Sequence, residues 1–230
     1  MPKTSDIAGR IQEIRKRMSE ASIRSGRQPD NVTLLAVTKT LSVETIQRAY
    51  DAGLRELGEN RVQEAMEKMD QLPVDIRWHL IGQLQTNKIN KIIGKFVLVH
   101  SVDSLHLAEA LSTRIGAEKQ DILLEVNAAG EESKAGTPPG EAVSTADAIT
   151  KLPGIQLRGL MTVGPQTQDS QKQRESFKKL KELFEIIRRK DGAGPAFNIL
   201  SMGMSGDFEI AIEEGSTLVR VGTGLFGVRA

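Results

Sequence analysis

The 230-residue sequence contains no cysteine, and this absence removes a whole class of chemistry. Disulfides, thiolate nucleophiles and cysteine-ligated zinc are all excluded, and a chain without cysteine fits a reducing compartment. The three histidines, His79, His100 and His106, do not have the spacing of a metal site. We therefore expect neither a disulfide-stabilised scaffold nor a metal centre.

The sequence also lacks an excess of charge and a long apolar run. Lys and Arg total 31 against 30 for Asp and Glu, which gives a formal net charge of +1. Such a chain has no general attraction to nucleic acid or to an anionic membrane surface. No stretch approaches the ~20 apolar residues of a membrane span, and the N-terminal segment has no apolar core of a signal peptide. We therefore expect a cytoplasmic protein with neither nucleic acid nor membrane as partner.

Short apolar, β-branched segments alternate with segments of helical spacing along the chain. An amphipathic helix is predicted over residues 5–25. Eight strands are predicted after it, at residues 34–38, 56–58, 78–81, 96–100, 122–127, 157–162, 198–201 and 218–221. The helices between them are expected to begin near Ser42, Arg61, Asn87, Ser104, Pro138, Ser170 and Gly206.

This alternation indicates parallel β-α-β units and therefore an α/β protein. With no linker or low-complexity tract, the chain is expected to form one domain over residues 1–230. Eight units in about 200 residues favour a single (β/α)8 TIM barrel with an extra N-terminal helix. A doubly wound open sheet is the structural alternative.

Barrel enzymes carry their sites at the carboxyl ends of the strands, and several polar segments follow predicted strands here. Lys39 follows the first strand, and the sequence GENR (58–61) follows the second. SMGMSGD (201–207) follows the seventh strand, and RVGTG (220–224) closes the eighth. The loop at 128–140, AAGEESKAGTPPG, follows the fifth strand and is either a lid or a solvated surface loop.

The segments after strands seven and eight predict a phosphate site. Barrels often bind phosphate there, next to a helix N-terminus. Ser205 and Gly206 are expected to open a helix whose first N–H groups favour an anion. Gly222 allows close approach of the backbone, and Thr223 adds a hydroxyl. The Ser-Gly-Asp segment alone would be an ordinary helix start, but its pairing with VGTG favours phosphate.

Lys39 and Arg220 are cations placed at the ends of apolar strands. Exposure to solvent would explain each of them, but a charge inside a barrel is costly unless it has a partner. A lysine at a pocket mouth is also a usable amine nucleophile. A phosphate site, a lysine amine and a positioned arginine together suggest pyridoxal 5′-phosphate (PLP), which binds lysine as a Schiff base and pairs its pyridine nitrogen with a side chain.

Longer motifs then narrow the possible protein families. These motifs are AVTKT, ELGENRVQEA, WHLIGQLQTNK, GLMTVGP and LSMGMSGDFEIAIEEGSTLVRVGTGLFG. From about residue 5 to the C-terminus, the sequence closely resembles the pyridoxal phosphate homeostasis proteins, the proline-synthase-co-transcribed family. The resemblance implies a (β/α)8 barrel like the N-terminal domain of alanine racemase. It also implies that PLP is the cofactor.

The resemblance assigns roles to individual residues. Lys39 would carry PLP as an internal aldimine. Ser205, Gly222 and Thr223 would hold the phosphate, and Arg220 would face the pyridine nitrogen. The covalent anchor and the non-covalent contacts are therefore expected at one end of the barrel.

Other residues are given less defined places by the same resemblance. Asn60 and Met204 would lie beside the cofactor. His79 would line the pocket, although a packed and hydrogen-bonded core histidine fits the sequence equally well. Met161 is expected in the core or the pocket wall. Residues 133–136 match the family's loop after strand five and receive no role beyond gating.

The residues that an amino-acid racemase needs are expected to be missing. Alanine racemase-like enzymes pair the lysine with a tyrosine base and add a second, β-rich domain, which we do not expect here. The single tyrosine, Tyr50, is expected to pack in the first crossover helix. Arg220 is always protonated, so it donates a hydrogen bond to the pyridine nitrogen without readily supplying a proton, and the ring is a weaker electron sink.

We therefore expect a non-catalytic, monomeric carrier that holds PLP reversibly. Its role would be intracellular PLP (vitamin B6) homeostasis, with delivery of PLP to apo-enzymes. One alternative is a weak amino-acid racemase or another PLP enzyme. A second alternative is a Schiff-base aldolase-type barrel without cofactor, which would use the same lysine and phosphate loops.

Overall fold

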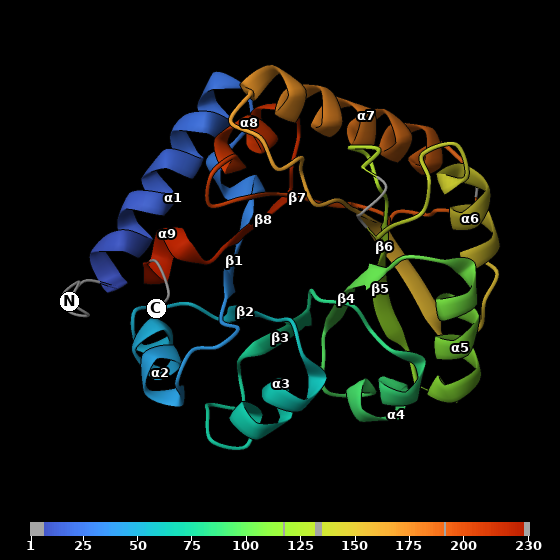
Figure 1. Ribbon diagram of the computed structural model, residues 1–230, viewed down its shortest axis with the longest axis horizontal. Coiled ribbons are helices and arrows are strands. Elements are labelled where there is room, and N and C mark those ends of the chain that lie inside the picture. The colour runs from blue at the N-terminus through green and yellow to red at the C-terminus, as the bar shows by residue number, and fades with distance from the viewer. Residues whose placement is uncertain (1–6, 117, 132–134, 191, 228–230) are drawn as a thin grey trace.

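The computed structural model describes residues 7–116, 118–131, 135–190 and 192–227. Eight parallel strands pair in sequence order, and the last closes on the first to form a barrel (Figure 1). They are β1 (Thr33–Val37), β2 (Glu56–Glu59), β3 (Arg77–Leu80), β4 (Leu98–Val102), β5 (Gln120–Glu125), β6 (Ile155–Met161), β7 (Ile199–Met204) and β8 (Leu218–Val221). The predicted (β/α)8 barrel is confirmed, and the open sheet is wrong.

Helices surround the barrel, and a further helix precedes it, as predicted (Figure 1). They are α1 (Ile7–Arg24), α2 (Val43–Asp51), α3 (Val62–Met69), α4 (Ile89–Ile92), α5 (Leu105–Ile115), α6 (Ala142–Ile149), α7 (Ser170–Arg188), α8 (Phe208–Glu213) and α9 (Thr223–Phe226), with 3-10 turns at Pro29–Asn31 and Thr86–Lys88. Ser42 and Ser104 act as N-caps of α2 and α5, because each hydroxyl accepts a backbone N–H at 3.3 Å.

Some predicted boundaries are wrong by two to four residues. β4 begins at Leu98 rather than at residue 96, because the N–H of Phe96 still bonds to the carbonyl of Ile92 and closes the turn after α4. α6 begins at Ala142 rather than near Pro138, since residues 138–141 first form a hydrogen-bonded turn. α9, which follows β8 directly, was not predicted.

Apolar packing occurs in two layers. The inner faces of the helices cover the outside of the barrel with a large cluster that includes Trp78, Phe177 and Phe208. Within the barrel, Leu98, Leu123 and Met161 form a small separate cluster. Met161 is therefore a core residue, which is one of the two places that the sequence allowed.

Helix α1 lies against α8 and α9 (Figure 1). Its buried face carries Ile11, Ile14 and Met18, and its polar face is joined to α8 by an ion pair of 2.7 Å between Arg17 and Glu209. Because α8 and α9 follow β7 and β8, α1 supports from outside the loops in which the phosphate site is predicted. Across the described ranges, no helix combines the length and apolar character that a bilayer crossing requires.

Candidate cofactor site

Lys39 lies in the turn that follows β1, at the carboxyl end of the barrel. Its neighbour Thr40 has φ +61°, the one positive value among the described non-glycine residues. The Thr40 N–H donates to the carboxylate of Glu64, which holds this left-handed turn. The half-buried Lys39 ammonium makes no hydrogen bond or ion pair within the described ranges, so its amine is available to a ligand.

A buried ionic network anchors the backbone beside Lys39. The Lys68 ammonium donates to the Thr38 carbonyl at 3.0 Å and to the Glu59 carboxylate at 2.8 Å. It also lies 2.6 Å from Glu64 Oε1, and the Thr38 hydroxyl donates to Glu59 at 2.7 Å. Burial raises the pKa of Glu59, although the hydrogen bonds from Lys68 and Thr38 oppose it. The turn that carries Lys39 is thereby tied to α3 from two sides.

Arg220 projects into the barrel from β8 and is 5% exposed. It donates to the Ser201 hydroxyl at 2.6 Å and to the Thr162 carbonyl at 2.8 Å. Burial lowers the pKa of Arg220 to about 10, against the opposing charges of Glu125 and Asp207, so the guanidinium stays protonated at neutral pH. Two of its five N–H donors are used in these bonds, which leaves others for a ligand.

The strand register places Arg220 and Lys39 on neighbouring strands. Arg220 is the partner of Leu35 in the β1–β8 pairing. Lys39 lies four residues after Leu35, in the turn that continues β1 toward the carboxyl end of the barrel. Along these two neighbouring strands, Lys39 therefore lies nearer the mouth of the barrel than Arg220.

The segments after β7 and β8 meet, as the phosphate prediction requires. The Ser205 hydroxyl oxygen accepts the backbone N–H groups of Gly222, at 3.2 Å, and Gly224, at 3.1 Å. These N–H groups converge on one oxygen, and Thr223 between them has an exposed side chain. Hydroxyl and N–H donors that converge in this way suit a phosphate.

The helix expected to open at Ser205 and Gly206 begins later, at Phe208. The reason is a turn in which the Asp207 carboxylate accepts the N–H of Met204 at 2.6 Å. The backbone N–H donors near Ser205 therefore come from the start of α9, not from α8.

Asn60 and Met204 both lie at the mouth of the barrel. Asn60 follows β2 directly, and its carbonyl would be 2.3 Å from a Cβ added to Gly82, so the segments after β2 and β3 pack closely. Met204 is the last residue of β7 and pairs in register with Arg220. These positions are compatible with the places predicted for both residues.

His79 lies deeper in the barrel, away from the mouth. It is 4% exposed, its Nδ1 is 2.9 Å from His100 Nε2, and its Nε2 is 2.6 Å from the Glu56 carboxylate. Glu56 is the first residue of β2, at the opposite end of the barrel from Lys39. The structure therefore favours the packed and hydrogen-bonded alternative for His79.

Glu125 was missed by the sequence analysis. It ends β5 and is 7% exposed. Burial raises the pKa of Glu125 to about 7, with Arg220 lowering it and Asp103 raising it further. The available signal was a carboxylate at the carboxyl end of the apolar strand ILLE. The buried guanidinium therefore has a carboxyl with a pKa of about 7 within its electrostatic reach.

The loop at residues 128–140 is described in part. The Thr137 N–H donates to the Glu125 carbonyl at 2.8 Å, and the Asn127 N–H donates to the Thr137 carbonyl at 3.1 Å. Residues 133 and 134 lie outside the described residues, so the predicted gating role stays a prediction. The remaining segment pairs with the end of β5 beside Glu125.

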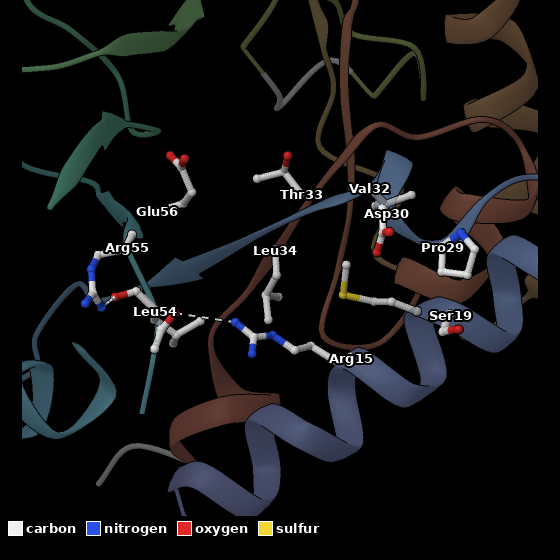
Figure 2. A pocket seen from close by; sticks show the side chains of 12 residues that line it. Arg15, Ser19, Pro29, Asp30, Val32, Thr33, Leu34, Leu54, Arg55 and Glu56 are labelled. Atoms are coloured by element: carbon white, nitrogen blue, oxygen red, sulfur yellow. Dashed lines mark hydrogen bonds between the residues drawn. The ribbon is translucent and has the colours of Figure 1, made fainter. Parts of the chain in front are cut away.

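A separate groove lies at the other end of the barrel, between α1 and the starts of β1 and β2 (Figure 2). Its basic groups already have partners: Arg15 donates to the Gly53 carbonyl at 3.4 Å, and Arg55 pairs with Asp75 at 2.8 Å. Tyr50 also bonds to Asp75, at 2.6 Å, so the single tyrosine packs away from Lys39, as predicted. We do not place the cofactor in this groove.

The donor set at the mouth fits PLP. An amine without a partner can take an aldehyde, converging N–H and hydroxyl groups can take a phosphate, and a buried guanidinium can donate to a ring nitrogen. No cluster of metal-binding side chains occurs among the residues that the structure describes. The site can therefore hold a phosphorylated aldehyde by one covalent and several polar contacts.

Comparison with known proteins finds a matching family and relatives of similar length. The family described as "Alanine racemase, N-terminal domain" matches residues 10–230. A pyridoxal phosphate homeostasis protein of Aquifex aeolicus is 42% identical over 223 residues, with 96% of this chain and 97% of that protein covered.

Solved structures with a similar fold are also found. PipY of Synechococcus elongatus, in a structure with PLP bound, has a TM-score of 0.79 at 36% identity, covering 96% of this chain and 100% of PipY. Alanine racemase of Corynebacterium glutamicum shares the fold, with a TM-score of 0.76 at 14% identity, over 98% of this chain and 62% of the racemase.

Proposed function

This chain belongs to the pyridoxal phosphate homeostasis proteins, and we propose that it binds PLP reversibly through Lys39. The observation that carries the proposal is the gathering of three kinds of donor at one end of the barrel. These are the Lys39 amine, the Arg220 guanidinium, and the Ser205 hydroxyl with the N–H groups that it meets. The PLP-bound structure of PipY, a relative at 36% identity, supports the same cofactor.

Each donor has a defined task in this proposal. PLP supplies an aldehyde that forms a Schiff base with an amine, and Lys39 is that amine. Ser205, Gly222 and Thr223 hold the phosphate, while Arg220 donates to the pyridine nitrogen. Asn60 and Met204 flank the ring at the mouth of the barrel.

We propose a carrier rather than an efficient enzyme. Tyr50 is engaged at the far end of the barrel and does not serve as a base near Lys39. Arg220 stays protonated at neutral pH, so the pyridine nitrogen receives a hydrogen bond rather than a proton. The cofactor would be released by transimination to an incoming amine, in PLP homeostasis and in delivery to apo-enzymes. The protein would act as a cytoplasmic monomer.

Glu125 favours a second candidate function, slow exchange of an amino acid's α-proton. Burial raises the pKa of its carboxyl to about 7, and the charge of Arg220 acts on it, which is suitable for a second base in addition to Lys39. Deuterium uptake from solvent into an amino acid would support this function if Glu125→Gln removed it. No uptake by the PLP-loaded protein would contradict it.

A titration with PLP tests the proposed binding site. Ser205→Ala removes a hydroxyl that meets two backbone N–H groups, and we expect PLP affinity to fall about 10- to 100-fold, as for a lost charge-assisted hydrogen bond. The change is measured by visible absorbance during the titration. Ser144→Ala is the matched control, because the Ser144 hydroxyl bonds only to the Glu141 carbonyl on α6. Equal affinity of wild type and Ser205→Ala would contradict the phosphate role.

A further inference from the structure

A line of polar side chains crosses the interior of the barrel. Arg220 Nη1 donates to Ser201 Oγ at 2.6 Å, and His100 Nδ1 lies 3.1 Å from the same oxygen. His100 Nε2 is 2.9 Å from His79 Nδ1, and His79 Nε2 is 2.6 Å from Glu56 Oε2. We call these five residues the interior chain. It joins β8, β7, β4, β3 and β2, in that order.

The two ends of the interior chain face opposite ends of the barrel. Arg220 belongs to the cofactor site. Glu56 is the first residue of β2 and lies beside Thr33, the first residue of β1, at the other end (Figure 2). Its side chain is 25% exposed, whereas His100 is fully buried. The interior chain therefore connects the cofactor site with a carboxylate near solvent.

The two end residues of the interior chain, Arg220 and Glu56, determine which group donates and which accepts in each hydrogen bond. A guanidinium only donates, and an ionised carboxylate only accepts. Burial works to raise the pKa of Glu56, but the hydrogen bonds from His79 and Arg77 outweigh it, and the pKa lies below its usual value. Burial, with the charges of His79 and Arg220, holds the pKa of His100 well below its usual value. His100 is therefore neutral, with one donor and one acceptor nitrogen.

One arrangement gives every proton in the chain an acceptor without adding a charge. Arg220 donates to Ser201, whose hydroxyl donates to Nδ1 of His100. His100 Nε2–H then donates to Nδ1 of His79, and His79 Nε2–H donates to Glu56. In the opposite arrangement the Ser201 oxygen accepts twice, and its own proton finds no partner among the described residues. Such an orphaned buried donor is costly.

Resting on the proposed contact between Arg220 and the cofactor ring, we propose that the interior chain is a positioning system for that guanidinium. His100 and His79 hold Ser201, one of the two hydrogen-bond partners of Arg220, in a single hydrogen-bond direction. Glu56 anchors that direction from the far end of the barrel. Arg220 is thus held before the cofactor arrives, with its remaining N–H groups turned toward the cofactor, and binding costs less side-chain ordering.

The tautomers of the two buried histidines provide the first test, in protein without cofactor. The sequence has three histidines, so two-bond ¹H–¹⁵N correlations resolve every ring, and the exposed His106 serves as the solvent reference. The arrangement predicts protons on Nε2 alone for both His79 and His100 above neutral pH. A proton on Nδ1 of His100 would overturn the proposal, whether or not PLP binds.

The serine link provides a second test. Ser201→Ala should shift the ¹⁵N signal of His100 Nδ1 and the visible band of bound PLP, and Ser201→Thr, which keeps the hydroxyl, should restore both. Ser216→Ala is the matched control, because this buried serine, two residues before β8, bonds only to backbone carbonyls of Leu200, Met202 and Leu218. Unchanged His100 and PLP signals in Ser201→Ala would overturn the proposal.

A substitution of Glu56, at the far end of the interior chain, distinguishes positioning of Arg220 from simple hydrogen bonding of buried polar groups. Glu56→Gln weakens the anchor at the end of the barrel opposite Lys39, and we expect PLP affinity to fall about threefold or more. Asp121→Asn is its control, because Asp121 shares the same cavity and pairs with Arg158 instead. Equal effects of both variants, or no effect of Glu56→Gln, would contradict positioning. Failure of wild type to bind PLP would instead contradict the proposed function.

Discussion

At the scale of single residues, the site combines groups whose charge is fixed with one group that titrates near neutral pH. The charges of Arg220 and Glu125 influence each other inside the barrel, and both residues are almost fully buried. Burial moves the pKa of each toward neutral, downward for the guanidinium and upward for the carboxyl. Of these two groups, Glu125 is therefore the one that changes its charge near neutral pH.

Glu125 should make the stability of the protein depend on pH. Its pKa is raised from 4.5 to about 7 in the folded state, so between these values the native protein binds more protons than the unfolded chain. The free energy of unfolding should then fall as pH rises through this window, by up to about 3 kcal/mol. Glu125→Gln should remove that dependence and stabilise the protein at pH 8.

Urea unfolding of wild type and Glu125→Gln between pH 5 and pH 8 measures this effect. Glu131→Gln is a suitable control, since Glu131 lies in the loop after β5 and is only half-buried. Parallel pH profiles for wild type and Glu125→Gln would contradict the buried, titrating carboxyl.

The positions of residues were predictable from sequence where a motif was local. Lys39 and Ser205 each follow a recognisable apolar strand, so their place at the mouth of a barrel could be predicted. The bond between His100 and Ser201 could not, because these residues are 101 positions apart and meet only after the barrel closes. Glu125 was overlooked because its strand reads as a continuous apolar core segment.

At the scale of elements, the phosphate site depends on close packing between β7 and α8. Gly203 has φ +93°, and a Cβ there would lie 2.5 Å from Ala211 Cβ and 2.9 Å from Phe208 Cα. A glycine therefore lets α8 begin directly against the strand end. This packing sets the position of Ser205 in the turn between the two elements.

Gly203→Ala should destabilise the protein and loosen the phosphate site. Gly53→Ala is a matched control, because Gly53 has φ +89° with nothing within 4 Å of an added Cβ. In both variants, backbone strain should lower the free energy of unfolding by about 1–3 kcal/mol. Only Gly203→Ala should lower it by about 1–3 kcal/mol more, because its added methyl group overpacks the contact with α8. Thermal unfolding and PLP titration measure both effects. Equal losses in the two variants would contradict the packing argument.

The order of elements was predictable because alternating patterns report local structure. All eight predicted strands overlap the observed ones, even the short segment at 56–58 that became β2. Boundaries failed where side chains or turns compete with regular structure. Asp207 closes a turn before α8, and α9 spans only Thr223–Phe226, too short to show a helical period.

At the scale of the whole molecule, the barrel closes its own sheet and covers it with helices. The large apolar side chains that remain exposed in the described ranges are Ile23, Val74, Val97 and Ile186. They lie on four different segments of the sequence, whereas a protein interface needs apolar side chains gathered in one patch. We therefore expect one chain per particle in sedimentation velocity, with and without PLP. A dimer at micromolar concentration would contradict this expectation.

The most direct measurement is reduction of the PLP-loaded protein with borohydride, followed by peptide mass mapping. The Lys39 amine has no partner among the described residues, because α3 holds only the backbone of Thr38 and Thr40 on either side of it. The Lys39 amine should therefore be the group that becomes covalently modified. The account predicts loss of the visible band and a reduced adduct on the peptide that contains Lys39. An adduct on another lysine, or no adduct with PLP in excess, would contradict the central claim.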